Sequence, residues 1–202
     1  VETTVLRQAA PPHMPELAVR REMATSKDGT KIPVNIIARK DYFDSHKPAP
    51  AIVWGYGGYG VNESPGFSRR VLLFAEQGGI YATTNIRGGG EYGERWHLEG
   101  NLTKKQNVFD DFQAACQYMI DKGYTTREKL AIFGGSNGGL LMGATFTQKP
   151  DLCKAVVSAV GSVATTRPFR RTVTTSVSSR ISRSLCVMRT TLLPSPRSAF
   201  RM

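Results

Sequence analysis

Ser136 is the residue in this sequence whose surroundings most clearly favour nucleophilic chemistry. Residues 134–138 (Gly-Gly-Ser-Asn-Gly) fit the pattern G-x-S-x-G. The apolar run Leu130–Phe133 before them predicts a buried strand, and Leu140–Met142 predicts a helix after them. A serine on such a sharp turn is exposed at the sheet edge, where the N–H groups of the helix N-terminus favour developing negative charge. The alternative is a serine that only caps a helix, but the flanking strand, the helix and the surrounding glycines favour a nucleophile.

Two further glycine-rich segments follow predicted strands. Residues 55–60 (Gly-Tyr-Gly-Gly-Tyr-Gly) and 88–93 (Gly-Gly-Gly-Glu-Tyr-Gly) both match G-x-G-x-x-G, so a dinucleotide-binding loop must be considered. That loop has to open a helix, whereas Pro65 and Gly66 break any helix after the first segment, and residues 84–87 lack the acid that would hold a ribose. We therefore interpret both segments as loops at the carboxyl ends of neighbouring strands, where open α/β sheets bind ligands.

Alternating strands and helices are expected to position these loops. Residues 27–30 (Lys-Asp-Gly-Thr) predict a tight turn between two extended segments, the second over 32–37. Further strands are expected over 51–54, 80–86, 130–133 and 155–160, with helices over 70–77 and 107–122. The central strands are continuous apolar runs, which is typical of strands buried on both faces. The pattern predicts an α/β fold: a mostly parallel sheet with helices on both faces.

Length and composition are those of an ordinary globular domain. The chain has 202 residues, 40% of them hydrophobic, and it has no run of 18 apolar residues, so no membrane partner is expected. Three cysteines without metal-binding spacing indicate reduced, mostly buried thiols and favour a cytoplasmic location. Because the sequence starts at Val1, we expect its N-terminus to be incomplete.

The net charge of +11 is concentrated at the C-terminal end. Residues 162–202 hold eight arginines and no lysine, acid or glycine; without those eight, 19 basic residues stand against 16 acids. We expect an extended connector over 1–24, a domain over 25–161 and an Arg/Ser/Thr-rich tail over 162–202. The tail is either a product of a shifted reading frame or a wrongly joined exon, or a real extension that contacts acidic partners. The abrupt change inside a strand–loop unit favours the first, so no nucleic-acid partner is expected.

Taken together, these segments resemble the catalytic domain of the prolyl oligopeptidase family of serine peptidases. The matching stretches are Lys27-Asp-Gly-Thr-Lys-Ile-Pro33, Gly55-Tyr-Gly-Gly-Tyr59, Asn85-Ile-Arg-Gly-Gly-Gly-Glu-Tyr-Gly93, Lys105-Gln-Asn-Val-Phe-Asp-Asp-Phe112 and Gly134-Gly-Ser-Asn-Gly-Gly139. The resemblance implies an α/β-hydrolase fold and cleavage of short peptides on the carboxyl side of proline. It implies no metal or organic cofactor. Asn137 resembles prolyl oligopeptidase proper, because the related oligopeptidase B group usually has alanine there.

The resemblance also implies roles for individual residues. Ser136 matches the nucleophile, and the backbone N–H of Asn137 matches one donor to the oxyanion. Tyr56 matches the tyrosine whose hydroxyl is the second donor; a phenol with a pKa of about 10 stays protonated and can donate at neutral pH. Without the resemblance, we would interpret Tyr56 as an aromatic residue that packs under the edge of the sheet. Tyr59 matches an aromatic residue of the proline pocket.

One part of the family pattern is missing. In this fold the catalytic triad follows the order serine, acid, histidine. Beyond Ser136 the sequence has one acid, Asp151, and no histidine, since His13, His46 and His97 all precede the serine. His97 matches a family histidine that is not catalytic.

We therefore expect the chain to hold the nucleophile half of the domain, truncated before the triad acid and histidine, and to be inactive alone. The alternatives are another α/β-hydrolase acting on esters or lipids, and a non-catalytic basic protein that binds nucleic acid through the tail.

Overall fold

A computed structural model describes most of the chain. It covers residues 15–45, 47–64, 66, 68–159, 173–175 and 185–190, with only the backbone given for the last two ranges. His13, His46 and the side chain of Cys186 lie outside the described residues, as does most of the Arg/Ser/Thr-rich tail. The reading-frame interpretation of that tail therefore stays a prediction.

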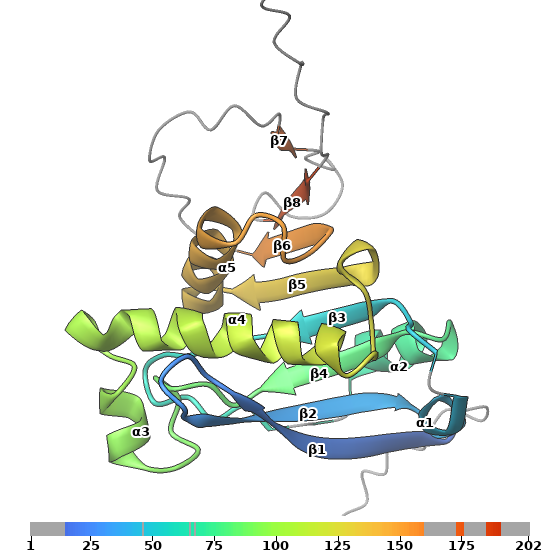
Figure 1. Cartoon of the computed structure of the whole chain (residues 1–202), viewed down its shortest axis with the longest axis horizontal. Coiled ribbons are helices and arrows are strands. Elements are labelled where there is room, and N and C mark those ends of the chain that lie inside the picture. Colours follow the sequence, from blue (N-terminus) through green and yellow to red (C-terminus); the bar gives the residue numbers. More distant parts are fainter. Residues whose placement is uncertain are drawn as a thin grey trace, which may run out of the picture.

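A single mixed sheet organises the described residues (Figure 1). Its spatial order is β1-β2-β4-β3-β5-β6-β8-β7. The strands are β1 (Leu17–Thr25), β2 (Lys31–Arg39), β3 (Ala51–Trp54), β4 (Ile80–Thr84), β5 (Leu130–Gly135), β6 (Ala155–Ala159), β7 (Val173–Thr175) and β8 (Leu185–Thr190). The four central strands β4, β3, β5 and β6 are parallel, as expected, while the flanking strands pair antiparallel.

Helices lie on both faces of this sheet. The helices are α1 (Tyr42–Ser45), α2 (Arg69–Glu76), α3 (Glu94–Leu98), α4 (Lys105–Asp121) and α5 (Asn137–Gln148), with 3₁₀ turns at Leu102–Lys104 and Arg127–Lys129. The crossover from β3 to β4 runs toward one edge of the sheet, whereas the crossovers from β4 to β5 and from β5 to β6 run toward the other edge. Because such crossovers are right-handed, α4 and α5 share one face and α2 covers the other (Figure 1). Of the helices described, none is long and apolar enough to cross a membrane.

The core forms where α4 packs on the sheet. The apolar side chains of this helix recur at helical spacing and face the sheet: Val108, Phe112, Ala115, Cys116 and Met119 are fully buried, and Phe109 and Ile120 are partly buried. Burying a large apolar side chain contributes about 1.5–3 kcal/mol, so this face holds the helix against the strands.

Two of the three cysteines belong to the described part of the interior. Cys116 and Cys153 are both buried. Burial raises the pKa of both thiols, to about 12 for Cys153. At neutral pH both are therefore protonated, unreactive core groups.

The N-terminal connector differs from the expectation in one respect. Residues 17–24 are extended, but they belong to β1, which pairs with β2 over nine residue pairs from Leu17↔Arg39 to Thr25↔Lys31. Most side chains of β1 are exposed or half-buried and only Ala24 is buried, so its sequence lacks the apolar run of a central strand. The tight turn predicted at residues 27–30 is confirmed, with Gly29 at φ 87°.

The parallel strands bring their carboxyl ends to one edge of the sheet. Residues 55–60 follow β3, residues 85–93 follow β4, and Ser136 follows β5. We call this edge the carboxyl rim; it lies at the left in Figure 1. Asn137 and Tyr56, which lie 81 positions apart in the sequence, meet there.

Candidate active site

Ser136 occupies the turn between β5 and α5 in a conformation that few non-glycine residues adopt. Its φ is 54° and its ψ is −118°. Two backbone hydrogen bonds hold it there: its N–H donates to the carbonyl of Ala159 at 2.8 Å, and its carbonyl accepts from the N–H of Gly139 at 2.8 Å. Such strain costs about 1–3 kcal/mol and is typical of functional sites. The residue is exposed, so the turn presents it at the carboxyl rim.

Two of the glycines around Ser136, Gly134 and Gly138, are required by space. A Cβ atom at Gly134 would overlap the backbone carbonyl of Gly138, and one at Gly138 would lie 2.6 Å from the carbonyl oxygen of Gly55. At Gly143, further along α5, a Cβ atom would meet nothing within 4 Å. Strand β5 and helix α5 therefore approach each other closely at this turn, and Gly138 also lets residues 55–60 pack against it.

The first glycine loop, residues 55–60, packs on the serine turn through Asn137. The Nδ2 group of Asn137 donates a hydrogen bond to the backbone carbonyl of Tyr56 at 2.6 Å. A Cβ atom at Gly58 would collide with this same amide. Tyr56 is half-buried, while Tyr59 is 79% exposed with φ 55°. Both tyrosines therefore lie on a loop in direct contact with the residue that follows Ser136.

The second glycine loop, residues 85–93, packs in turn on the first. The N–H of Gly60 donates to the carbonyl of Gly88 at 3.0 Å. A Cβ atom at Gly88 would lie 2.6 Å from the carbonyl oxygen of Gly57, so the two backbones touch. The imidazole Nδ1 of His97 lies 3.0 Å from the carbonyl oxygen of Gly88. His97 thus contacts this loop through its imidazole, and its non-catalytic role stays a prediction.

A buried ion pair anchors the second loop to the helical layer. Arg87 is 4% exposed and Asp111, on α4, is fully buried. The guanidinium donates twice to Asp111, from Nε at 2.9 Å and from Nη2 at 2.6 Å, and also donates to Asp28 in the β1–β2 turn. The hydrogen bond from Arg87 lowers the pKa of Asp28 to about 2. Sequence reasoning missed this cluster, because no spacing rule joins residues 28, 87 and 111.

Lys105 is a second residue that sequence reasoning left without a role. It stands in one of the stretches that carry the family resemblance, at the first position of α4. Its Nζ donates to the carbonyl of Gly57 at 2.7 Å and to Oδ1 of Asn137 at 3.2 Å. It therefore contacts the first glycine loop and the serine turn together.

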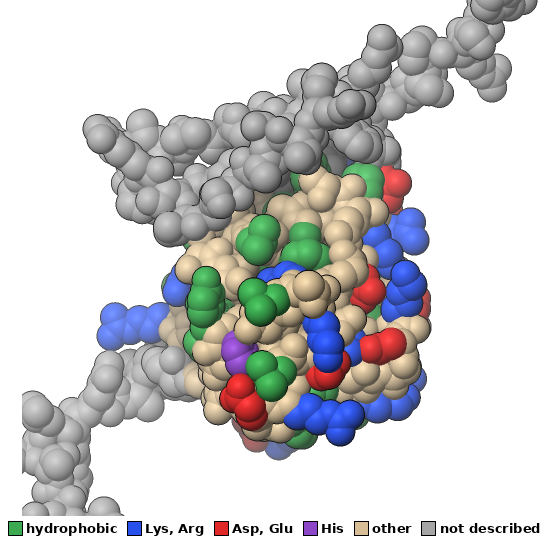
Figure 2. Space-filling model, turned by 90° about the vertical axis from the view of Figure 1, so that its left-hand side faces the viewer, with side chains coloured by type: hydrophobic (Ala, Val, Ile, Leu, Met, Phe, Trp, Pro, Cys, Tyr) green, Lys and Arg blue, Asp and Glu red, His purple; other side chains and the backbone are tan. Residues whose placement is uncertain are grey.

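Exposed apolar side chains surround these groups. Figure 2 looks onto the carboxyl rim and shows hydrophobic side chains gathered near the middle of this face. The large exposed apolar side chains of the loops and helix ends at this rim are Tyr59, Val61, Tyr92, Leu98, Leu102 and Leu140. Apolar surface around an exposed serine suits a substrate with apolar side chains or rings.

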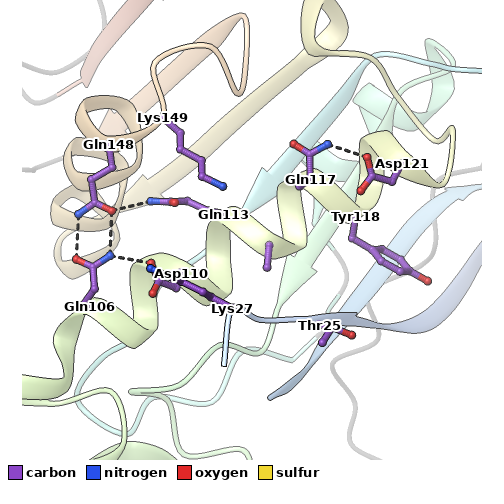
Figure 3. Close-up of a pocket in the computed structure, with 11 residues that line it drawn as sticks. Thr25, Lys27, Gln106, Asp110, Gln113, Gln117, Tyr118, Asp121, Gln148 and Lys149 are labelled. Atoms are coloured by element: carbon purple, nitrogen blue, oxygen red, sulfur yellow. Dashed lines mark hydrogen bonds between the residues drawn. The ribbon is translucent and has the colours of Figure 1, made fainter. Parts of the chain in front are cut away.

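A polar hollow of about 670 Å³ lies elsewhere, on the outer face of α4 (Figure 3). It is lined by the end of α5, the start of the β1–β2 turn and a polar stripe of α4. Its side-chain amides bond to one another: Gln113 donates to Gln148 at 2.9 Å, and Gln106 donates to Gln148 at 3.0 Å. Neither Ser136 nor either loop tyrosine lines this hollow, so it is separate from the candidate site.

The one acid that follows Ser136 is far from it. Asp151 lies beyond the C-terminal end of α5, whereas Ser136 lies at its N-terminal end. A helix of 12 residues is about 18 Å long, so Asp151 is at the opposite edge of the sheet. Within the described ranges, no three His, Cys, Asp or Glu side chains are grouped so that they could hold a metal ion.

Comparison with known proteins gives a consistent result. The family model described as "Prolyl oligopeptidase family" matches residues 65–180. The chain is 50% identical over 137 residues to a prolyl endopeptidase of Elizabethkingia meningoseptica, covering 68% of this chain and 19% of the relative. It is 49% identical over 136 residues to a prolyl endopeptidase of Dictyostelium discoideum, covering 67% and 18%. The chain thus spans about a fifth of the length of these curated relatives.

Solved structures agree. A structure from a study of two prolyl endopeptidases superimposes with a TM-score of 0.70 at 50% identity, covering 72% of this chain and 21% of that one. Oligopeptidase B from Leishmania major superimposes with a TM-score of 0.70 at 40% identity, covering 72% and 20%. The α/β-hydrolase fold expected from the sequence is confirmed by these likenesses. This chain belongs to the prolyl oligopeptidase family.

Proposed function

We propose that this chain supplies the nucleophile and the oxyanion donors of a serine peptidase that cleaves short peptides after proline. The observation that carries the proposal is the strained, exposed Ser136, held between β5 and α5 with the first glycine loop packed beside it. Prolyl endopeptidase is the name of relatives that are about 50% identical to this chain.

In this proposal Ser136 attacks the carbonyl carbon of the residue at the cleavage site, and its hydroxyl proton passes to a general base. The oxyanion that forms accepts hydrogen bonds from the backbone N–H of Asn137 and the hydroxyl of Tyr56. Preorganised donors of this kind stabilise the transition state strongly, because they need no reorientation as the charge develops. The base then gives this proton to the amine nitrogen as the C–N bond breaks and the amine product leaves. Water hydrolyses the ester formed at Ser136 and releases the hydroxyl of the serine.

Tyr59 is proposed to contact the substrate proline. Its side chain is 79% exposed at the carboxyl rim, and an aromatic face offers a flat apolar surface to a pyrrolidine ring.

No residue of this chain is assigned the role of general base. No histidine follows Ser136 in the sequence, whereas the triad of this fold has its histidine after the serine. Without a base of suitable pKa, the serine hydroxyl is a weak nucleophile. We therefore propose that the 202-residue chain does not turn over peptide by itself.

The test needs an enzyme that supplies the base. We define the grafted enzyme as the prolyl endopeptidase of Elizabethkingia meningoseptica in which the 137 aligned residues are replaced by those of this chain. It should hydrolyse a chromogenic Gly-Pro substrate, and Ser136→Ala should lower kcat by at least about 10⁴-fold. Retained peptidase activity in Ser136→Ala would exclude Ser136 as the nucleophile. Preference for acyl esters over Gly-Pro substrates would instead support an ester hydrolase.

A further inference from the structure

Lys105 connects the two parts of the proposed oxyanion site. Its ammonium donates to the carbonyl of Gly57 in the first glycine loop and to Oδ1 of Asn137 at the serine turn, residues that lie 48 and 32 positions away. The side chain is half-buried, and no ion pair among the described residues includes it. Its two hydrogen bonds tie the first residue of α4 to the first glycine loop and to the serine turn.

These contacts define the orientation of the Asn137 side chain. An ammonium can only donate, so the amide atom that faces Lys105 is the oxygen. A backbone carbonyl can only accept, so the amide atom that faces Tyr56 is the nitrogen, at 2.6 Å. Lys105, Asn137 and the Tyr56 carbonyl thus form one directed chain of hydrogen bonds. Its middle and last members, Asn137 and Tyr56, are the two residues proposed to stabilise the oxyanion.

We propose that Lys105 is a positioning residue that holds the Tyr56 loop and the Asn137 turn in register for oxyanion binding. This inference rests on the proposed function. Lys105 acts through Asn137 and through Gly57, the neighbour of Tyr56, and does not itself contact the substrate. Loss of its two hydrogen bonds leaves the loop packed by its glycines but free to shift relative to the turn. Small displacements of this kind lower kcat more than they change substrate binding.

Burial supports this assignment. Desolvation lowers the pKa of Lys105, which means that partial burial of its ammonium is unfavourable for the free energy of folding. The neighbouring Lys104 provides the contrast: its side chain is 52% exposed and pairs with Glu99 at 2.7 Å on the surface. The two adjacent lysines therefore form a matched pair, one turned inward to the site and one outward to solvent.

The kinetic test compares these two lysines in the grafted enzyme. Lys105→Met should lower kcat by about tenfold or more, with KM changed less than about twofold, whereas Lys104→Met should leave both unchanged. Lys105→Arg, which keeps a cationic donor, should recover part of the lost kcat. Equal kcat values for the two Met variants would overturn the proposal. If the Ser136→Ala enzyme stays active, the proposed function itself fails, so the two failures are distinguishable.

A double-mutant cycle separates positioning from general stability. If Lys105 acts through Asn137, then Lys105→Met should have a clearly smaller effect on kcat in the Asn137→Ala background than in the parent. Fully multiplicative effects of the two changes would show that Lys105 does not act through Asn137.

A second readout uses the 202-residue chain directly and requires no activity. Lys105→Met should speed amide hydrogen exchange of residues 55–60 and 136–139 by about tenfold relative to Lys104→Met, with α2 unaffected. Should Lys105→Met fail to fold, Lys105→Gln replaces it in both tests, since an amide can still donate to one carbonyl. Unchanged exchange in these two segments would contradict the proposal.

Discussion

The side-chain amide of Asn137 donates a hydrogen bond to the backbone carbonyl oxygen of Tyr56 at 2.6 Å. These residues lie 81 positions apart, on the turns that follow β5 and β3. The bond joins the residue after the proposed nucleophile to the residue proposed as the second oxyanion donor. The position of one turn therefore depends on the position of the other, and changes in either turn are expected to affect the same catalytic step.

Replacement of Tyr56 by phenylalanine tests the oxyanion role. In the grafted enzyme, Tyr56→Phe should lower kcat by about 10- to 1000-fold with little change in KM, which is the scale of losing one oxyanion donor. Tyr92→Phe is the matched control, because Tyr92 is a half-exposed tyrosine at the same rim with no proposed contact to the reacting atoms. Steady-state kinetics on a Gly-Pro substrate measures both. An unchanged kcat in Tyr56→Phe would assign Tyr56 to packing.

Two glycines of α5 are expected to respond in opposite ways to the same substitution. Gly138→Ala places a Cβ atom 2.6 Å from the carbonyl oxygen of Gly55, so we expect a loss of about 1–3 kcal/mol from overpacking and a fall in kcat. Gly143→Ala meets open space in a helix interior and should stabilise by up to about 1 kcal/mol with kcat unchanged. Thermal melting and kcat of the grafted enzyme measure both effects. Equal melting temperatures for the two variants would disprove the close approach.

The ionisation of Asp28 should make the free energy of unfolding depend on pH. Its pKa is lowered from 3.8 to about 2 by the hydrogen bond from Arg87. A depressed carboxyl pKa contributes stability that is present above pH 3.8 and is lost as the pH falls through about 2. Asp28→Asn should therefore lower the urea midpoint of the grafted enzyme at pH 5, and the difference from the parent should shrink toward pH 2.

The exposed Asp44 in α1 provides the control for this effect, through Asp44→Asn. A difference between parent and Asp28→Asn that stays constant from pH 5 to pH 2 would show that Asp28 is not linked to folding.

The 202-residue chain alone should not hydrolyse a Gly-Pro substrate. Ser136 needs a base, and the triad histidine of this fold follows the serine, whereas no histidine follows Ser136 in this sequence. The measurement is turnover by the purified chain, with and without a serine-directed phosphonate. Turnover that the phosphonate abolishes would show that the chain carries its own base.

Regular elements were predictable because their apolar patterns are local. The buried face of α4 and the short strand Ala51–Trp54 follow directly from the spacing of apolar residues. The serine turn was predictable for a related reason, since Gly134 and Gly138 stand where side chains cannot fit. Edge strand β1 was harder, because one of its faces is largely open and its sequence is accordingly mixed.

The contacts that join distant segments could not be predicted. In the sequence, Arg87 is an arginine before a glycine loop and Asp111 is an acid within a predicted helix. The fold nevertheless buries them together as an ion pair. Lys105 appears as one of several lysines, and only the three-dimensional structure shows that it reaches Gly57 and Asn137. The sequence shows which side chains can form hydrogen bonds and ion pairs. Which of them become partners depends on how the crossover connections arrange the strands in space.

Three residues at the carboxyl rim, Tyr59, Leu102 and Ser136, hold positive φ angles without being glycine. Glycine at any of them would relieve backbone strain. A library of grafted-enzyme variants that is screened only for heat resistance should therefore be enriched in glycine at position 136. The same library screened for peptide turnover should lack glycine there. Evolution in the laboratory toward stability alone would then convert this turn into an inert, well-folded loop.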